Sequence, residues 1–179
     1  DAGRRGQMIV DCSTAEPDST TRLRATCAER GVMFIDAPLA RTPKEAEEGR
    51  LNTMVGAADA DFERLAPVMK AFCENVIHVG PPGTGHVLKL INNFLAMSIA
   101  TSTAEAFAAA AKAGLPLAKL VEVISAGGVN SGVFRMIGEG AGDGVKDMLF
   151  EDARIEKFRV LGAGVRVGVG GDDVPYLHH

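Results

Sequence analysis

The sequence changes character at Gly80-Pro-Pro-Gly83-Thr-Gly85-His-Val-Leu-Lys89-Leu-Ile-Asn92-Asn93. Before this stretch, short apolar runs alternate with segments of helical periodicity, which is the pattern of βαβ units around a mostly parallel sheet. After it, helical periodicity continues without a strand signal as far as residue 137. The sequence therefore predicts an α/β half followed by an all-helical half, entered by one long helix over residues 86–113.

Four strands are expected before this stretch, and they cover residues 8–11, 32–36, 52–56 and 76–79. Helices are expected between them, ending near residue 30, starting at residue 43, and covering residues 59–72. Two capping boxes, Ser13 with Glu16 and Thr42 with Glu45, predict the starts of the first two helices. Later in the chain, the pattern predicts a helix over residues 116–124 and another that Ser131 caps.

The composition argues against several classes of protein. The 179 residues hold 19 Lys and Arg against 23 Asp and Glu, a net charge of −4, so no basic field attracts nucleic acid. The most apolar helical stretch, around residues 94–111, contains Glu105 and many small residues, which favours a buried helix over a membrane span. Cys12, Cys27 and Cys73 have neither metal-binding nor disulfide spacing, and we expect no metal site. Free thiols fit the cytoplasm.

Lys89 is the first candidate for chemistry, because it lies in the second turn of the predicted long helix. Asn92 and Asn93 follow at three and four residues, and Asn93 shares its face. Apolar neighbours and the helix start are expected to lower the pKa of this lysine. It could then give a proton to a carbonyl oxygen that receives a hydride, and take it back in reverse. The glycines are expected to leave free N–H groups at the helix start for a ligand. The alternative is an amphipathic lysine whose ammonium reaches water.

Two further segments follow predicted strands, where ligands of parallel sheets bind. In Asp36-Ala-Pro-Leu-Ala40-Arg41-Thr42, the arginine precedes a helix cap and could hold an anionic group together with helix N–H groups. In Asp11-Cys-Ser13-Thr14, hydroxyl groups could contact a cofactor. The alternatives are a surface arginine beside an ordinary cap, and a capping box.

Four motifs in this order resemble those of the β-hydroxyacid dehydrogenase family, which includes 3-hydroxyisobutyrate dehydrogenases and tartronate semialdehyde reductases. They are D-x-S-T at residues 11–14, the D-A-P loop at 36–42, G-x-L-x-x-M-V-G at 49–56, and G-x-G-x-x-x-K-x-x-N-N at 83–93. The resemblance covers residues 7–137.

The resemblance implies a domain organisation. Residues 1–83 would be the distal, C-terminal part of a Rossmann-type NAD(P)-binding domain, whose G-x-G-x-x-G phosphate loop would lie upstream of Asp1. Residues 84–137 would be the interdomain helix and the start of an all-α domain like that of 6-phosphogluconate dehydrogenase, which forms a homodimer or homotetramer at full length. Residues 138–179 are a Gly-rich irregular tail that the resemblance does not reach, either flexible or a corrupted terminus.

The resemblance also implies a reaction, the reversible NAD- or NADP-dependent oxidation of a small anionic β-hydroxyacid to its aldehyde or ketone. Lys89 would be the catalytic proton donor and acceptor, with Asn93 beside it. The cofactor would contact Ser13, Thr14 and Lys157. The substrate would contact Ala40, Arg41, Thr42 and Asn92.

Two departures from the family pattern matter: the loop at residues 40–42, and the C-terminal segment around Lys157, which matches the family's later helices only loosely. Ala40-Arg41-Thr42 stands where the family usually has Ser-Gly-Gly, and it resembles the loop of sulfolactaldehyde reductases, in which the arginine engages a sulfonate. We therefore expect a sulfonate or a second acidic group on the substrate. Without a phosphate loop, the chain alone is expected to be an inactive fragment. A non-enzymatic binding or assembly module on the same fold is the other alternative, against which Lys89 argues.

Overall fold

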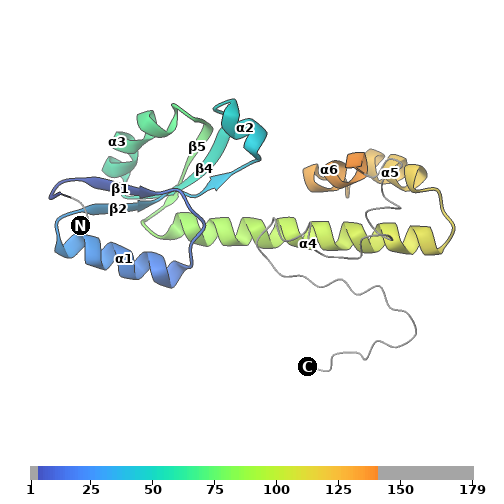
Figure 1. Ribbon diagram of the computed structural model, residues 1–179, viewed down its shortest axis with the longest axis horizontal. Coiled ribbons are helices and arrows are strands. Elements are labelled where there is room, and N and C mark those ends of the chain that lie inside the picture. Colours follow the sequence, from blue (N-terminus) through green and yellow to red (C-terminus); the bar gives the residue numbers. More distant parts are fainter. Residues whose placement is uncertain (1–3, 141–179) are drawn as a thin grey trace, which may run out of the picture. The chain divides into compact units, whose positions relative to one another are not determined.

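The structure, a computed structural model, describes residues 4–140 (Figure 1). Its first elements alternate between strand and helix, and its last three are helices. In chain order they are β1 (Met8–Asp11), α1 (Pro17–Glu29), β2 (Met33–Asp36), β3 (Leu39–Ala40), α2 (Pro43–Glu47), β4 (Leu51–Gly56), α3 (Asp59–Met69), β5 (Cys73–Gly80), α4 (Thr84–Lys112), α5 (Leu117–Ala126) and α6 (Gly132–Gly140). The chain divides between Leu95 and Ala96, inside α4, into two compact units. The predicted α/β character of the first half is confirmed.

The sheet of the first unit is mixed, so the prediction of a mostly parallel sheet is wrong in this respect. β1 pairs with β2 and β4 with β5 in parallel, whereas β4 runs antiparallel to both β2 and β3. The chain continues past the end of β2 and pairs again with β4 as β3, a two-residue strand that the sequence did not predict. The carboxyl ends of β2 and β4 therefore meet, at the pair Asp36 and Gly56.

The predicted helix ends are confirmed in part. Helix α1 stops before Gly31, whose φ of +67° favours glycine. The Thr42–Glu45 capping box is present at α2, and Ser131 Oγ accepts the N–H of Phe134 at 3.0 Å. The Ser13–Glu16 box is wrong, because Glu16 is itself the N-cap of α1 and no side chain caps that helix. Pro17 disfavours the helical conformation for the residue before it, and Glu16 is extended with a ψ of 138°, so the helix starts at Pro17.

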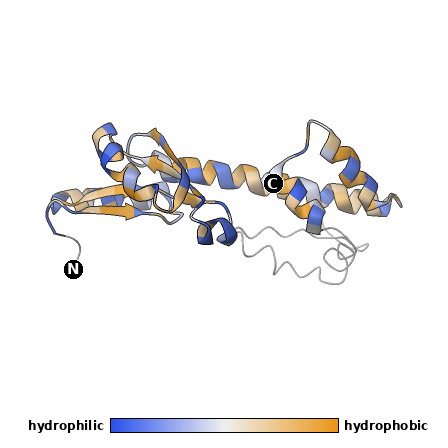
Figure 2. Ribbon diagram, turned by 90° about the horizontal axis from the view of Figure 1, so that it is seen from above, coloured by the Kyte–Doolittle hydropathy of each residue, from blue (hydrophilic) through white to orange (hydrophobic). Residues whose placement is uncertain are grey.

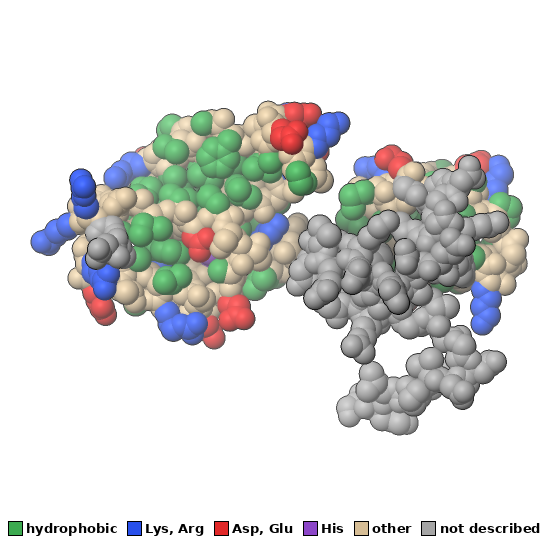
Figure 3. Space-filling model, viewed as in Figure 1, with side chains coloured by type: hydrophobic (Ala, Val, Ile, Leu, Met, Phe, Trp, Pro, Cys, Tyr) green, Lys and Arg blue, Asp and Glu red, His purple; other side chains and the backbone are tan. Residues whose placement is uncertain are grey.

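The first unit has an apolar core between the sheet and helix α3. Ile35 and Val55 from the strands and Leu65 and Met69 from α3 are almost fully buried there. The strands are correspondingly hydrophobic along most of their length (Figure 2). Hydrophobic side chains also gather on the visible surface of this unit (Figure 3). Burial of the strands against α3 fixes the sheet, and with it the loops at the strand ends.

Helix α4 spans 29 residues, close to the predicted range. By length and composition alone it would be able to cross a membrane, a test that the core helix of a soluble protein also passes. In the described part of the chain only one stripe of α4 is buried, so the prediction of a buried helix is met on that stripe alone. The buried positions are Gly85, His86, Ala100, Thr103, Phe107 and Ala110.

The second unit contains the later part of α4 together with α5 and α6. Phe107 of α4 and Phe134 of α6 are buried against each other, with ring centroids 6.1 Å apart. Apolar side chains of α5 pack around this pair, among them Leu120 and Ile124. This small aromatic cluster explains why the segment folds back as helices after the turn at Gly114.

Candidate active site at the start of helix α4

Asp36 caps helix α4 from the end of β2. Its side chain is fully buried, and its two carboxylate oxygens accept the N–H of Gly83 at 2.6 Å and the N–H of His86 at 3.0 Å. The expectation that free N–H groups at this helix start bind a ligand is therefore wrong for these two groups. The carboxylate instead ties the helix to the sheet and complements the positive end of its dipole.

Two glycines make this contact possible. A Cβ on Gly85 would lie 2.4 Å from the carbonyl oxygen of Met54 and 2.8 Å from that of Asp36. A Cβ on Gly56 would lie 2.7 Å from the Asp36 carboxylate. Real Cβ atoms do not approach other atoms this closely, so any larger residue at either position would push α4 away from the strands. The glycine motif thus serves close packing of helix and sheet.

Lys89 lies one helical turn after Gly85, on the side of α4 that begins with the buried residues Gly85 and His86. Its side chain is half-buried, and burial lowers the pKa of its ammonium group. No carboxylate among residues 4–140 pairs with it. A half-buried, unpaired lysine with a lowered pKa is typical of a site that moves protons.

The two asparagines behave differently. Asn93 is half-buried and shares the face of Lys89, whereas Asn92 is exposed and points to another face of the helix. The helical spacing therefore groups Asn93, and not Asn92, with Lys89. The substrate role predicted for Asn92 stays a prediction.

Ser13 and Thr14 are exposed in the turn after β1. The backbone N–H of Ser13 donates to Asp11 Oδ1 at 2.9 Å, and neither hydroxyl is used to cap α1. The Ser13 side chain also hydrogen-bonds the Asp11 carboxylate, and the exposed turn lies at the carboxyl end of β1, where ligands of parallel sheets bind. Lys157, the third residue predicted to contact a cofactor, lies outside the described residues.

His86 is a residue of this site that the sequence did not identify. It is fully buried, and its Nδ1 lies 2.6 Å from the hydroxyl oxygen of Thr20 in α1. Its Nε2 lies 4.0 Å from Asp11 Oδ2. The available signal was its position, directly after the glycine turn and three residues before Lys89.

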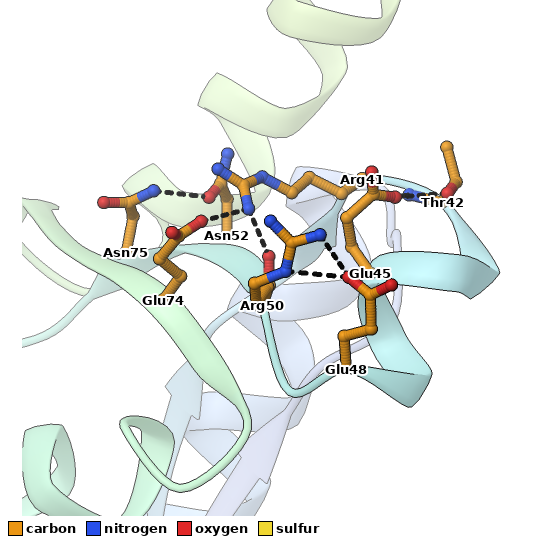
Figure 4. Close-up of polar contacts among 8 residues, drawn as sticks. All are labelled: Arg41, Thr42, Glu45, Glu48, Arg50, Asn52, Glu74 and Asn75. Carbon is orange, nitrogen blue, oxygen red and sulfur yellow. Dashed lines mark hydrogen bonds and ion pairs between the residues drawn. The ribbon is translucent and has the colours of Figure 1, made fainter.

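The loop of Ala40, Arg41 and Thr42 forms a separate polar cluster at the tip of the sheet (Figure 4). Ala40 pairs with Asn52 in the sheet, and the Thr42 hydroxyl and N–H contact Glu45 in the capping box. The Arg41 guanidinium donates to the carbonyl oxygen of Arg50 at 2.5 Å and forms an ion pair with Glu74. The guanidinium of Arg41 is thus bound by groups of the protein itself.

The backbone of Arg41 is unusual. Its φ of +88° makes it the one residue other than glycine with a positive φ among residues 4–140. This conformation costs a side-chain-bearing residue of the order of 1–2 kcal/mol. Residues kept in such conformations cluster at functional sites, which makes this loop a second candidate for ligand contact.

The arrangement of the first unit is that of an α/β domain with a ligand site at the carboxyl ends of its strands. Asp11 and Thr14 lie at and just after the carboxyl end of β1, and Asp11 Oδ2 lies 4.0 Å from His86 on the helix that carries Lys89. In open α/β sheets, ligands bind outside the carboxyl ends of parallel strands. Among the described residues no three His, Cys, Asp or Glu side chains are grouped to hold a metal ion.

Comparisons with known proteins agree with an α/β domain that binds a ligand at its strand ends. Residues 1–80 match the family model of the NAD binding domain of 6-phosphogluconate dehydrogenase, and residues 83–160 match that of the NAD-binding of NADP-dependent 3-hydroxyisobutyrate dehydrogenase. The 2-(hydroxymethyl)glutarate dehydrogenase of Eubacterium barkeri is 38% identical over 123 residues, which are 69% of this chain and 41% of that protein.

Two further relatives are informative. The 3-sulfolactaldehyde reductase of Escherichia coli (strain K12) is 32% identical over 127 residues, covering 71% of this chain and 43% of that protein. A solved 3-hydroxyisobutyrate dehydrogenase from Mycobacterium tuberculosis with L-serine superposes with a TM-score of 0.69 at 29% identity, over 73% of this chain and 45% of that one. The chain thus spans about two fifths of the length of these curated relatives.

The chain belongs to the β-hydroxyacid dehydrogenase family. The matched domains define the cofactor class as NAD or NADP. The residues present fit the reacting end of such a cofactor, because the exposed Ser13 and Thr14 follow β1, whose Asp11 lies 4.0 Å from His86, one helical turn before the half-buried Lys89.

Proposed function

We propose that this chain is part of an NAD(P)-dependent oxidoreductase that interconverts a small anionic β-hydroxyacid and its aldehyde or ketone. The observation that carries the proposal is the environment of Lys89. Its side chain is half-buried, it has no ion-pair partner among the described residues, and burial lowers its pKa. It lies one turn after a helix start that Asp36 caps. Relatives named as dehydrogenases and reductases of small acids support it. Within the same proposal, the rest of the second unit is all-helical, and the protein is a cytoplasmic homodimer or homotetramer.

In this proposal each residue has a distinct task. Lys89 donates a proton to the substrate carbonyl oxygen during reduction and accepts the hydroxyl proton during oxidation. Asn93 orients Lys89 or the substrate oxygen, since it shares the lysine's helix face. The hydroxyls of Ser13 and Thr14 contact the cofactor. When bound, the nicotinamide cofactor supplies or accepts the hydride.

The test is turnover by the protein at full length. With a panel of three-carbon and four-carbon β-hydroxyacids, we expect NAD- or NADP-dependent oxidation, followed by absorbance of the reduced cofactor. If neither cofactor binds, and no acid in the panel is oxidised, the proposal is wrong. If both cofactors bind without turnover, the non-enzymatic alternative is favoured.

A second, narrower candidate is a substrate that carries a sulfonate or a second acidic group, bound by Arg41. The observation that favours it is an arginine in a conformation suited to glycine, held only by partly exposed groups. Its ion pair with Glu74 is solvent-accessible, and such pairs contribute about 0–1 kcal/mol. An anionic ligand can therefore replace Glu74 at little cost.

Arg41→Gly separates this role from a structural one. We expect the KM for a sulfonate substrate such as 3-sulfolactaldehyde to rise about tenfold or more, because a charge-assisted hydrogen bond is lost. The unfolding temperature should not fall, since glycine relieves the strained φ. Arg50→Ala, which removes an exposed arginine paired with Glu48 in the same cluster, is the matched control and should leave KM unchanged. An unchanged KM in Arg41→Gly would exclude the role.

A further inference from the structure

His86 is a fully buried titratable side chain of the site, and it touches several elements at once. Its Nδ1 lies 2.6 Å from Thr20 Oγ1 of α1, and its backbone N–H donates to Asp36 Oδ2 at the end of β2. Its Nε2 is buried and has no hydrogen-bond partner among the described residues, although it faces Asp11 Oδ2 at 4.0 Å. A buried polar atom left in this state requires an explanation beyond packing.

The carboxylate of Asp11 selects the tautomer of the ring. The Thr20 hydroxyl, 2.6 Å from His86 Nδ1, serves either tautomer, because it can donate to this nitrogen or accept from it while it donates to the carbonyl oxygen of Glu16. A bare Nε2 facing the Asp11 carboxylate would be repelled, so the electrostatics place the ring proton on Nε2.

The carboxylate of Asp11 continues this chain of contacts to the cofactor turn. Its other oxygen, Oδ1, accepts the N–H of Ser13 at 2.9 Å. Partial burial of Asp11 opposes ionisation, but the Ser13 hydrogen bonds and nearby His86 together lower its pKa, which keeps the carboxylate charged. Thr20, His86, Asp11 and Ser13 therefore form one connected series from α1 to the exposed turn.

We propose that His86 is a positioning residue that acts through Asp11 to hold the Ser13–Thr14 turn in register with Lys89, and so orders the surface that receives the nicotinamide end of the cofactor. This rests on the proposed function, since the ligand of the turn is taken from it. His86 precedes Lys89 by about one helical turn, so a single helix carries both the proton-transferring side chain and the residue that faces Asp11 beside the turn.

The first test measures the turn itself and needs no cofactor. In the full-length protein, His86→Leu should increase hydrogen exchange of the Ser13 amide about tenfold or more, because the Asp11 carboxylate loses its anchor. His86→Gln, whose amide can still donate toward Asp11, should restore most of the protection. The ¹⁵N shifts of the His86 ring should show the proton on Nε2. Unchanged Ser13 exchange in His86→Leu would overturn the proposal.

The second test measures binding. His86→Leu and Asp11→Asn should each weaken the binding of NADH or NADPH about tenfold, and the double variant should be no weaker than either alone, because both changes break one series. His78→Leu is the matched control: His78 is partly buried, its Nε2 lies 2.8 Å from the carbonyl oxygen of Ala57 and its ring stacks on Phe62, and these contacts do not involve residues 11–14. It should lower stability without changing cofactor affinity. Strictly additive effects of His86→Leu and Asp11→Asn would contradict the proposal.

The two tests keep the inference apart from the proposed function. If the unmodified protein binds neither cofactor, the proposed function fails, while Ser13 exchange still decides whether His86 positions the turn. If the unmodified protein binds a cofactor and His86→Leu binds it equally well, the inference fails and the proposed function stands.

Discussion

Lys89→Met is expected to lower kcat about a thousandfold, in both directions of the reaction, with little change in the unfolding temperature. A positioned acid–base group contributes typically 10²–10⁴-fold to a rate, and methionine keeps the length and apolar contacts of the lysine while it removes the proton. The KM of the substrate should change far less than kcat, because the proton matters most in the transition state. Single-turnover mixing of the full-length enzyme with saturating cofactor measures this directly.

The control is Lys112→Met, the same substitution at an exposed lysine in the last turn of α4. It should leave kcat unchanged. If Lys89→Met kept more than about a tenth of the activity, a group other than Lys89 would have to carry the proton, and the proposed mechanism would be wrong.

The pH dependence of kcat/KM follows from the downward shift of the Lys89 pKa. Reduction needs the ammonium form, so kcat/KM should be level below the pKa and fall above it. Oxidation needs the neutral amine, so kcat/KM should rise up to the pKa and level above it. Because burial lowers the pKa of Lys89, both limbs should lie below about 10.4, the value of a solvated lysine. Lys89→Met should remove both limbs together.

Local sequence signals predicted the elements whose causes are local. The Thr42–Glu45 box, the glycine at the end of α1 and the cap at Ser131 depend on neighbouring residues, and each is confirmed. The Ser13–Glu16 box has the same spacing, but Pro17 keeps Glu16 extended, and the Ser13 N–H donates to Asp11 instead. Two neighbouring residues, Asp11 and Pro17, thus prevent a box that the spacing alone predicts.

The parts that were missed depend on contacts between distant residues. β3 has two residues, too few for any periodicity, and forms only because β4 lies beside it. Asp36 looked like the start of a substrate loop, yet its carboxylate binds backbone groups 47 and 50 residues later. The buried contact of His86 likewise joins it to Thr20, which is 66 residues earlier in the chain. Motif spacing located Lys89, but only the fold revealed what holds its helix.

Asp36→Ala is expected to destabilise the first unit by about 4 kcal/mol. It leaves the partly buried N–H of Gly83 and the buried N–H of His86 without acceptors, at about 1–3 kcal/mol each, and removes a charge that complements the helix dipole. Thermal unfolding of this unit, followed by circular dichroism, should show a midpoint lower by about 16–32 °C. The midpoint of Asp36→Asn should lie between those of the unmodified protein and Asp36→Ala, since the one amide oxygen can still accept a hydrogen bond.

The matched control for Asp36 is Asp59→Ala, because Asp59 also lies in the first turn of a helix but its side chain is 97% exposed. Its loss should cost less than about 1 kcal/mol. If Asp36→Ala unfolded no earlier than Asp59→Ala, the capping role would be wrong. With the role intact, the loosened start of α4 should also shift Lys89, so that Asp36→Asn loses activity at temperatures where it is still folded. The loss of activity in Asp36→Asn would then report how strongly the cap at Asp36, 53 residues earlier in the sequence, determines the position of Lys89.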